Sequence, residues 1–163
     1  MDTNNQNGTT PTKNITSVER KSEREVVVTR TVNAPANLVF EAWTQADLFK
    51  RWWVPKSYGL NLVGCEMDIR VGGQYRLTFL HEGSTMEFFG TYLEVTPHSR
   101  IVWTNDEGDN GQTVTTVTFE EADGKTLLVV HDLYPTEEAV DTGSSGAMPE
   151  MFDQLEELLA SLG

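Results

Sequence analysis

Apolar residues alternate with polar ones over most of the middle of this 163-residue chain. A period of two is typical of half-buried β-strands, and short polar turns separate such stretches between Leu60 and Asp132. Asn-Gly and Asp-Gly pairs are preferred in two-residue hairpin turns. The region therefore predicts about six consecutive antiparallel strands, with turns at Gly72–Gly73, Glu82–Gly83, Pro97–His98, Asn110–Gly111 and Asp123–Gly124.

One more strand and two short helices are expected before this region. Alternating valines predict a strand over residues 25–32. Pro35 suits the first turn of a helix, and apolar residues then recur at helical spacing as far as Trp43. Residues 44–47 resemble a capping box with Asp in place of Glu, which predicts a second short helix that runs to Trp52.

The clearest helix is at the C-terminal end. Pro149 fits its first turn, and Glu150 and Asp153 lie where the helix dipole favours negative charge. Its apolar positions recur at three- and four-residue steps: Met148, Met151, Phe152, Leu155, Leu158, Leu159 and Leu162. Residues 1–22, in contrast, are polar and rich in Asn and Thr, which predicts a disordered tail. The domain is then expected to span residues 23–163.

These elements together predict an α+β fold. A curved antiparallel sheet of about seven strands would wrap around the long C-terminal helix, with the two short helices after the first strand. The length is sufficient for one domain with a substantial core. A sheet of this shape tends to enclose a cavity rather than to display a catalytic cleft.

Aromatic residues concentrate on the predicted strands. Tyr75, Leu77 and Phe79 share one face of a strand, whereas the adjacent Phe88 and Phe89 cannot both face inward without a bulge. Such residues usually fill a core, but a subset can line a cavity in which a few polar tips orient a ligand. We expect the following residues to line this cavity: Trp53, Tyr75, Phe79, Phe88, Tyr92, Trp103, His131, Met148, Met151 and Phe152.

His131 is the one titratable residue that the pattern singles out. It ends the last strand, near the place where the sheet should meet the closing helix. A histidine satisfied in the core or at an edge is the preferred interpretation over a catalytic base, because no nucleophile or orienting carboxylate can be assigned beside it. Asp132 is adjacent but should point to the opposite face of the strand. No catalytic residue is predicted.

The net charge of −13 at pH 7 is unevenly distributed. Residues 1–100 hold 11 basic and 11 acidic side chains, whereas residues 101–163 hold Lys125 alone against 14 acidic ones. An acidic surface repels phosphates, which argues against a nucleic-acid partner. The acidic C-terminal part either keeps the protein in solution or forms a docking face for a basic partner.

The sequence offers little support for a metal, a cofactor or a membrane segment. The three histidines have no paired spacing, no Cys/His cluster has zinc-ligand spacing, and Cys65 is the single cysteine. We therefore expect no metal and no cofactor. The N-terminal residues lack the basic and apolar regions of a signal peptide, and no run approaches the ~20 apolar residues of a membrane span. These features predict a cytoplasmic protein.

Several motifs occur in an order that resembles the START-like, or SRPBCC, superfamily, which includes the birch pollen allergen. More narrowly, they resemble the family of activators of heat-shock protein 90 ATPase. The motifs are Ala34–Thr44, Arg51–Pro55, Asp68–Gly73, Gly90–Pro97 and the final amphipathic helix. The resemblance implies a helix-grip fold, in which a cavity between helix and sheet commonly holds a hydrophobic ligand. Many relatives open the last helix with Gly-Trp, whereas this chain has Gly146–Pro149 there.

Three functions are compatible with this reading. The first is a soluble domain that binds a hydrophobic small molecule, which the cavity-forming fold and the scarcity of polar groups favour. The second is a chaperone-associated, stress-response protein that acts through the acidic C-terminal part. The third is a polyketide-cyclase-like enzyme that uses polar groups in the cavity such as Tyr75 or His131. The resemblance transfers no catalytic residue, and the sequence leaves the ligand unidentified.

Overall fold

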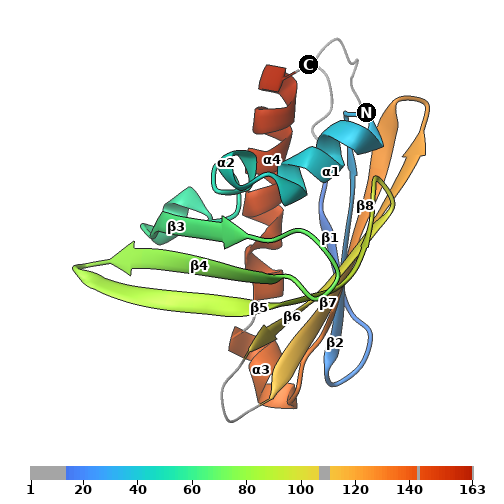
Figure 1. Cartoon of the computed structure of the whole chain (residues 1–163). Coiled ribbons are helices and arrows are strands. Elements are labelled where there is room, and N and C mark those ends of the chain that lie inside the picture. Colours follow the sequence, from blue (N-terminus) through green and yellow to red (C-terminus); the bar gives the residue numbers. More distant parts are fainter. Residues whose placement is uncertain (1–13, 107–110, 143, 163) are drawn as a thin grey trace, which may run out of the picture.

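A strongly curved antiparallel sheet wraps around one long helix (Figure 1). The computed structural model describes residues 14–106, 111–142 and 144–162. Within these residues the sheet has eight strands in the order β1-β2-β8-β7-β6-β5-β4-β3. The strands are β1 Ser17–Arg20, β2 Glu25–Val32, β3 Asn61–Met67, β4 Gln74–His81, β5 Ser84–Thr96, β6 Arg100–Asp106, β7 Gln112–Ala122 and β8 Lys125–Leu133. The helices are α1 Ala36–Thr44, α2 Ala46–Phe49, η1 Lys56–Tyr58, α3 Glu137–Thr142, η3 Ser144–Ala147 and α4 Met148–Leu162.

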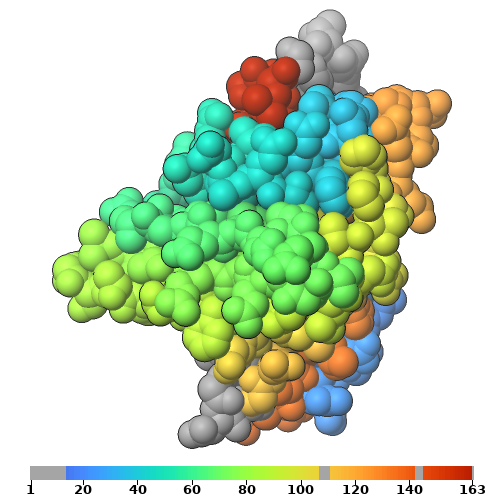
Figure 2. Space-filling model, viewed as in Figure 1, coloured from blue at the N-terminus to red at the C-terminus, as the bar shows by residue number. Residues whose placement is uncertain are grey.

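This arrangement confirms the α+β class, the antiparallel sheet and the long C-terminal helix. Helix α4 crosses the concave side of the sheet, α1 and α2 cover its upper part, and β3, β4 and β5 project as an arm (Figure 1). On the face that Figure 2 shows, the segment from α1 to η1 lies directly against β3 and the turn that follows it. The sheet, α4 and the α1–η1 segment thus form three walls around the interior.

Two of the predicted hairpin turns have the expected backbone conformation. Glu82 and Gly83 between β4 and β5 have φ values of 49° and 83°, and Asp123 and Gly124 between β7 and β8 have 56° and 78°. Two successive positive φ values are the feature of type I′ turns, whose twist matches that of the flanking strands. The predicted Asn110–Gly111 turn begins at a residue outside the described ranges.

Strand β1 differs from the expectation of a disordered tail through residue 22. It pairs antiparallel with β2 from Ser17 opposite Thr29 to Arg20 opposite Val26. All four of its side chains are exposed, so its order comes from backbone hydrogen bonds and leaves no apolar pattern in the sequence. Residues 1–13 of the predicted tail lie outside the described ranges.

The second short helix begins differently from the prediction. Thr44 is the last residue of α1, and its Oγ1 donates a hydrogen bond to the Phe40 carbonyl at 2.8 Å instead of capping α2. The predicted capping box is therefore wrong, and Gln45 holds the N-cap position. Helix α2 ends at Phe49, because Trp52 turns into the core and donates from Nε1 to the Ala42 carbonyl at 2.9 Å.

A buried ion pair fixes α4 to the first part of the sheet. Arg30 on β2 is 3 % exposed and bonds Asp153 at 2.7 Å and Glu156 at 3.1 Å. Its guanidinium also donates to the Thr16 hydroxyl at 3.1 Å. A buried cation is tolerated when its donors find acceptors, and the two carboxylates of α4 supply them.

Gly90 allows β5 and β6 to approach closely beside the interior. A Cβ at this position would lie 1.7 Å from the Thr104 carbonyl oxygen and 2.9 Å from the ring of Tyr75. Tyr75 stands directly opposite Gly90 on β4, and its hydroxyl donates to that same carbonyl at 2.8 Å. The missing side chain thus makes room for the Tyr75 ring, which becomes part of the inner wall.

Candidate ligand-binding cavity

A cavity of about 520 Å³ lies between the concave side of the sheet and the helices. Aromatic and aliphatic side chains form most of its wall, and a smaller set of polar ones lies at one end. The apolar lining is Trp43, Phe49, Trp53, Val54, Pro55, Leu60, Met67, Leu77, Phe88, Trp103, Ala147, Met148 and Met151. The remainder is Tyr58, Tyr75, Tyr92, Asn105, Thr113, Thr115, Asp132, Tyr134, Asp141 and Gly146.

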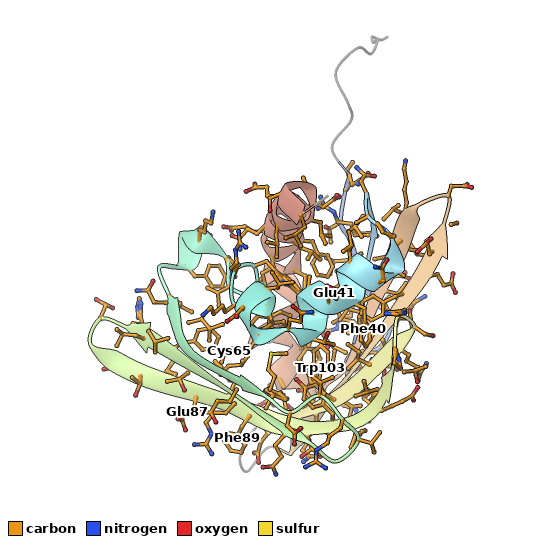
Figure 3. All side chains as sticks on the ribbon, turned by 45° about the horizontal axis from the view of Figure 1, so that its top comes forward. Phe40, Glu41, Cys65, Glu87, Phe89 and Trp103 are labelled. Atoms are coloured by element: carbon orange, nitrogen blue, oxygen red, sulfur yellow. The ribbon has the colours of Figure 1, made fainter. Side chains whose placement is uncertain are left out.

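The structure brings seven of the ten residues expected from the sequence into this lining: Trp53, Tyr75, Phe88, Tyr92, Trp103, Met148 and Met151. Trp103 lies in the interior between sheet and helices, whereas Glu87 and Phe89 project from the outer side of the sheet (Figure 3). Phe88 and Phe89 thus take opposite faces, with Phe88 directly opposite the inward Leu77.

The other three expected residues lie elsewhere. Phe79 is buried on β4 and packs edge-on against Phe88, with ring centroids 5.3 Å apart. Phe152 is buried behind the cavity, where its ring contacts those of Trp43 and Trp52. Both therefore support the wall from behind, whereas His131 has a different environment.

His131 points to the outer face of β8. Its Nε2 lies 2.8 Å from the Glu25 carboxylate on β2, and about a third of its side chain is exposed. The hydrogen bond from His131 lowers the pKa of Glu25. This is the satisfied edge histidine that the sequence favoured over a catalytic base, and it contributes nothing to the cavity.

One end of the cavity is a cluster of tryptophans. The ring of Trp43 on α1 lies 5.7 Å from that of Trp53 and 5.7 Å from that of Trp103, and Phe49 stacks on Trp53 at 4.7 Å. Among the described residues, the buried indole N–H of Trp43 has no hydrogen-bond partner. Trp43 and Phe49 were not among the expected cavity residues, although Trp43 shares the helical spacing of the other apolar residues of α1.

Asp132 forms the opposite, polar end. The residue is 2 % exposed, its Oδ1 accepts from Thr115 Oγ1 at 2.6 Å, and its Oδ2 accepts from Ser145 Oγ at 2.7 Å. The Tyr134 hydroxyl lies 2.6 Å from the same Ser145 oxygen. Tyr134 also hydrogen-bonds the Asp132 carboxyl, so the hydroxyl groups of Thr115, Ser145 and Tyr134 surround it.

Burial raises the pKa of Asp132 above its ordinary value of 3.8, and the hydrogen bonds from Thr115 and Ser145 oppose this effect only in part. Desolvation disfavours a charged carboxylate, and the cavity lining supplies no cation to compensate for it. A buried acid with a displaced pKa in a cavity is a common feature of functional sites. As predicted from the alternation of a strand, Asp132 faces away from His131, but the inner face of β8 is the one that holds Asp132 and not, as expected, His131.

The register of the sheet connects the two ends. Tyr92 on β5 stands opposite Trp103 on β6, Trp103 opposite Thr115 on β7, and Thr115 opposite Asp132 on β8. Directly opposed side chains share a face of the sheet, with Cβ atoms about 5 Å apart. One row across four strands therefore leads from aromatic rings to the carboxylate over roughly 10–15 Å.

The α1–η1 segment forms the wall that faces this row, and α4 holds it in place. Gln154 donates from Nε2 to the Val54 carbonyl at 2.8 Å and to the Trp52 carbonyl at 3.2 Å, and its Oε1 accepts from the Lys56 N–H at 2.9 Å. Glu150 accepts from the backbone N–H and the hydroxyl of Ser57. Neighbouring Trp53, Val54 and Pro55 line the cavity, so these bonds define its shape.

In the described part of the chain, no group of three or more His, Cys, Asp or Glu side chains is arranged to hold a metal ion. No helix there is long and apolar enough to cross a membrane.

Residues 33–160 match the sequence model of the family described as Activator of Hsp90 ATPase homolog 1-like protein. The chain belongs to this family. Among curated proteins, no sequence matches it significantly. The match spans the chain from just after β2 to the last turn of α4 and therefore includes every residue that lines the cavity.

Solved structures resemble this family member over most of its length. A Rhodobacter sphaeroides protein is 22 % identical with a TM-score of 0.81, covering 90 % of this chain and 99 % of its own. A Nitrosomonas europaea protein is 23 % identical with a TM-score of 0.78, covering 89 % and 99 %. A Staphylococcus epidermidis protein is 26 % identical with a TM-score of 0.75, covering 90 % and 95 %. At such low identity the first two show the fold alone.

The start of α4 contributes one flexible side chain to the cavity wall. Met148 is 1 % exposed and lines the cavity beside Ala147. A methionine is unbranched and adapts to irregular space more readily than the rigid ring of tryptophan. The wall of the cavity at this point is therefore easier to reshape around a ligand.

Proposed function

We propose that this chain binds a hydrophobic small molecule in the cavity between the sheet and α4. The observation that carries the proposal is the 520 Å³ cavity, with an aromatic cluster at one end and a few polar groups at the other. Its volume is within the range of about 300–1,000 Å³ for small-molecule sites, which are mainly apolar with a few placed polar groups. Covering its apolar wall with a ligand removes that surface from water, which favours binding.

Contacts from behind support part of the wall. Trp43 and the wall segment around Val54 are held from behind by other aromatic rings and by Gln154. A preformed site loses less conformational entropy on binding than one that must first be ordered. Tyr58 and Phe88 line the cavity and are 54 % and 40 % exposed. We expect a ligand to enter the cavity beside these two side chains.

A calorimetric titration with 1-naphthalenemethanol, a neutral aromatic probe, tests the proposal. The purified protein is expected to bind the probe with a dissociation constant in the micromolar to low millimolar range. Ala147→Phe places a ring in the cavity without removing an existing contact and should abolish binding. Ala160→Phe puts the same ring on the exposed side of α4 and should leave binding unchanged. The proposal is contradicted if the wild-type protein does not bind the probe, or if Ala147→Phe binds it as tightly as the wild-type protein does.

The family's description raises a second candidate, an interaction with the chaperone Hsp90. The acidic C-terminal part is the feature that supports it. Several of its carboxylates, however, already bond within the molecule, among them Glu150, Asp153 and Glu156. The exposed Glu137 and Glu138 on α3 stay available for a basic partner. A pull-down with purified chaperone at low salt tests this, since salt weakens contacts between exposed charges.

A cyclase-like enzyme is a third possibility that the cavity allows. Its acid or base would be Asp132 rather than His131, because only Asp132 lies in the lining. The hydroxyl groups around Asp132 all donate toward it, and the described lining has no Cys or His to act as nucleophile or base. Binding is therefore the better-supported function.

A further inference from the structure

The charged groups of the cavity are of one sign. Two carboxyl groups, those of Asp132 and Asp141, belong to the described lining, and none of its residues is Lys, Arg or His. Arg20 approaches Asp141 to 4.0 Å from β1, but the Asp141 side chain is 75 % exposed there and this contact lies outside the lining. The lining therefore presents carboxyl oxygens and no cationic side chain, so a cation is the charged group that fits the inner end of the cavity.

Asp132 retains the capacity to accept a further hydrogen bond. A carboxylate has about four lone-pair positions, and the hydroxyl groups of Thr115, Ser145 and Tyr134 occupy three of them. Its neighbour across β7 is Trp103, two strands away on the same face. Strands lie about 4.8 Å apart, so the ring of Trp103 begins roughly 10 Å from the carboxylate.

From this geometry we infer that the ligand is an amine with an aromatic body, bound as the ammonium ion. The ammonium group donates to the Asp132 carboxylate, and the aromatic body extends over Thr115 onto Trp103 and Tyr92. The inference rests on the proposed function, since it assigns a chemical class to the ligand of the same cavity. It also predicts that fatty acids and other carboxylates are poor ligands, because their charge would meet Asp132 in a dry site.

Two physical effects favour this class of ligand. An ammonium ion compensates a carboxylate that burial alone destabilises, and charge-assisted hydrogen bonds are roughly twice as strong as neutral ones. The faces of aromatic rings also attract cations, so the tryptophan and tyrosine rings of the lining attract the ammonium group as it enters the cavity. The net charge of −13 adds a long-range attraction for cations in water.

The test compares three probes that differ only in one group: 1-naphthylmethylamine, 1-naphthalenemethanol and 1-naphthoate. Calorimetry at neutral pH should rank the amine about tenfold tighter than the alcohol, with the carboxylate weakest. Asp132→Asn, which is nearly isosteric, should reduce the amine to the affinity of the alcohol while the alcohol still binds. Asp47→Asn removes the same charge from a side chain that is 95 % exposed and remote from the lining, so it should retain the preference.

The outcomes separate the two claims. If none of the three probes binds, the proposed function itself fails. If the alcohol binds as tightly as the amine, or if Asp132→Asn retains the preference, the cavity binds ligands but the assignment to amines is wrong. If Asp47→Asn loses the preference as fully as Asp132→Asn does, general charge attraction replaces Asp132 as the cause.

Discussion

Asp132 is buried and no cationic side chain lines the described cavity beside it, which determines much of the chemistry available there. Its carboxyl accepts hydrogen bonds from Thr115 and Ser145, yet burial still raises its pKa. In the unfolded chain the same group ionises near its ordinary value of 3.8. The folded protein therefore binds this proton more tightly than the unfolded chain does, and stability depends on pH through this residue.

The sign of that dependence follows directly. As pH rises above about 4, the unfolded state releases the proton first, so the free energy of unfolding falls until the folded state has released it as well. Asp132→Asn removes this loss. Thermal unfolding should show equal Tm values for variant and wild type near pH 4 and a higher Tm for the variant at pH 7.

His131 pairs with Glu25 on the outer face and is present in both proteins. Its contribution cancels when the variant is compared with the wild type at each pH. A Tm difference that is constant from pH 4 to pH 7, or that falls, would refute the role assigned to Asp132.

Gly90 provides a second test at this scale. In Gly90→Ala the new methyl group meets the Thr104 carbonyl and the Tyr75 ring, and the backbone of β5 has to move away. We expect a loss of about 2–4 kcal/mol, in the range of severe backbone and packing changes, measured by urea unfolding. Gly83→Ala, in the β4–β5 turn with open space around it, isolates the effect of positive φ and should lose about 1 kcal/mol. A smaller loss at Gly90 than at Gly83 would contradict the close approach.

At the scale of elements, α4 supports the cavity with its polar side chains as well as with its apolar ones. Gln154 is buried and satisfies three backbone groups of the segment between α2 and η1. The helix and its apolar stripe could be predicted from residue spacing alone. The role of Gln154 could not be predicted in this way, because residue spacing does not show which backbone groups a single polar side chain in an apolar stripe will contact.

Replacing Gln154 with Leu tests that support. The volume is similar, but the Trp52 and Val54 carbonyls and the Lys56 N–H lose their partner. Leaving such groups unpaired costs about 1–3 kcal/mol each when they are buried, and some here reach water, so we expect a total loss of about 2–3 kcal/mol. Hydrogen exchange should accelerate at the Lys56 amide, which marks a loosened wall.

Glu157→Leu is the matched control on the same helix. Glu157 is exposed and lies away from the wall segment, so its replacement should change stability by no more than about 0.5 kcal/mol. If Gln154→Leu were equally mild and left exchange at Lys56 unchanged, the segment would be held by its aromatic packing alone.

At the scale of the whole molecule, the sequence predicts the architecture better than it predicts the cavity. Alternation and turn pairs revealed the β3–β8 meander, and helical spacing revealed α4, because both signals are local. Strand β1 was missed because its exposed side chains give no pattern, and Asp132 because the inner face of β8 depends on how the sheet curves. Membership in the family places the helix over the sheet but leaves the ligand to be found by experiment.

The most direct test of the central claim follows the tryptophan indole N–H signals in a ¹⁵N–¹H correlation spectrum during titration with 1-naphthalenemethanol. Trp43, Trp53 and Trp103 line the cavity, whereas Trp52 does not and its N–H is bonded to the Ala42 carbonyl. If the cavity binds the probe, the first three signals shift in saturable fashion and that of Trp52 shifts least. If all four stay in place while amides on the outer face of the sheet shift, the probe binds elsewhere and the cavity is not the site.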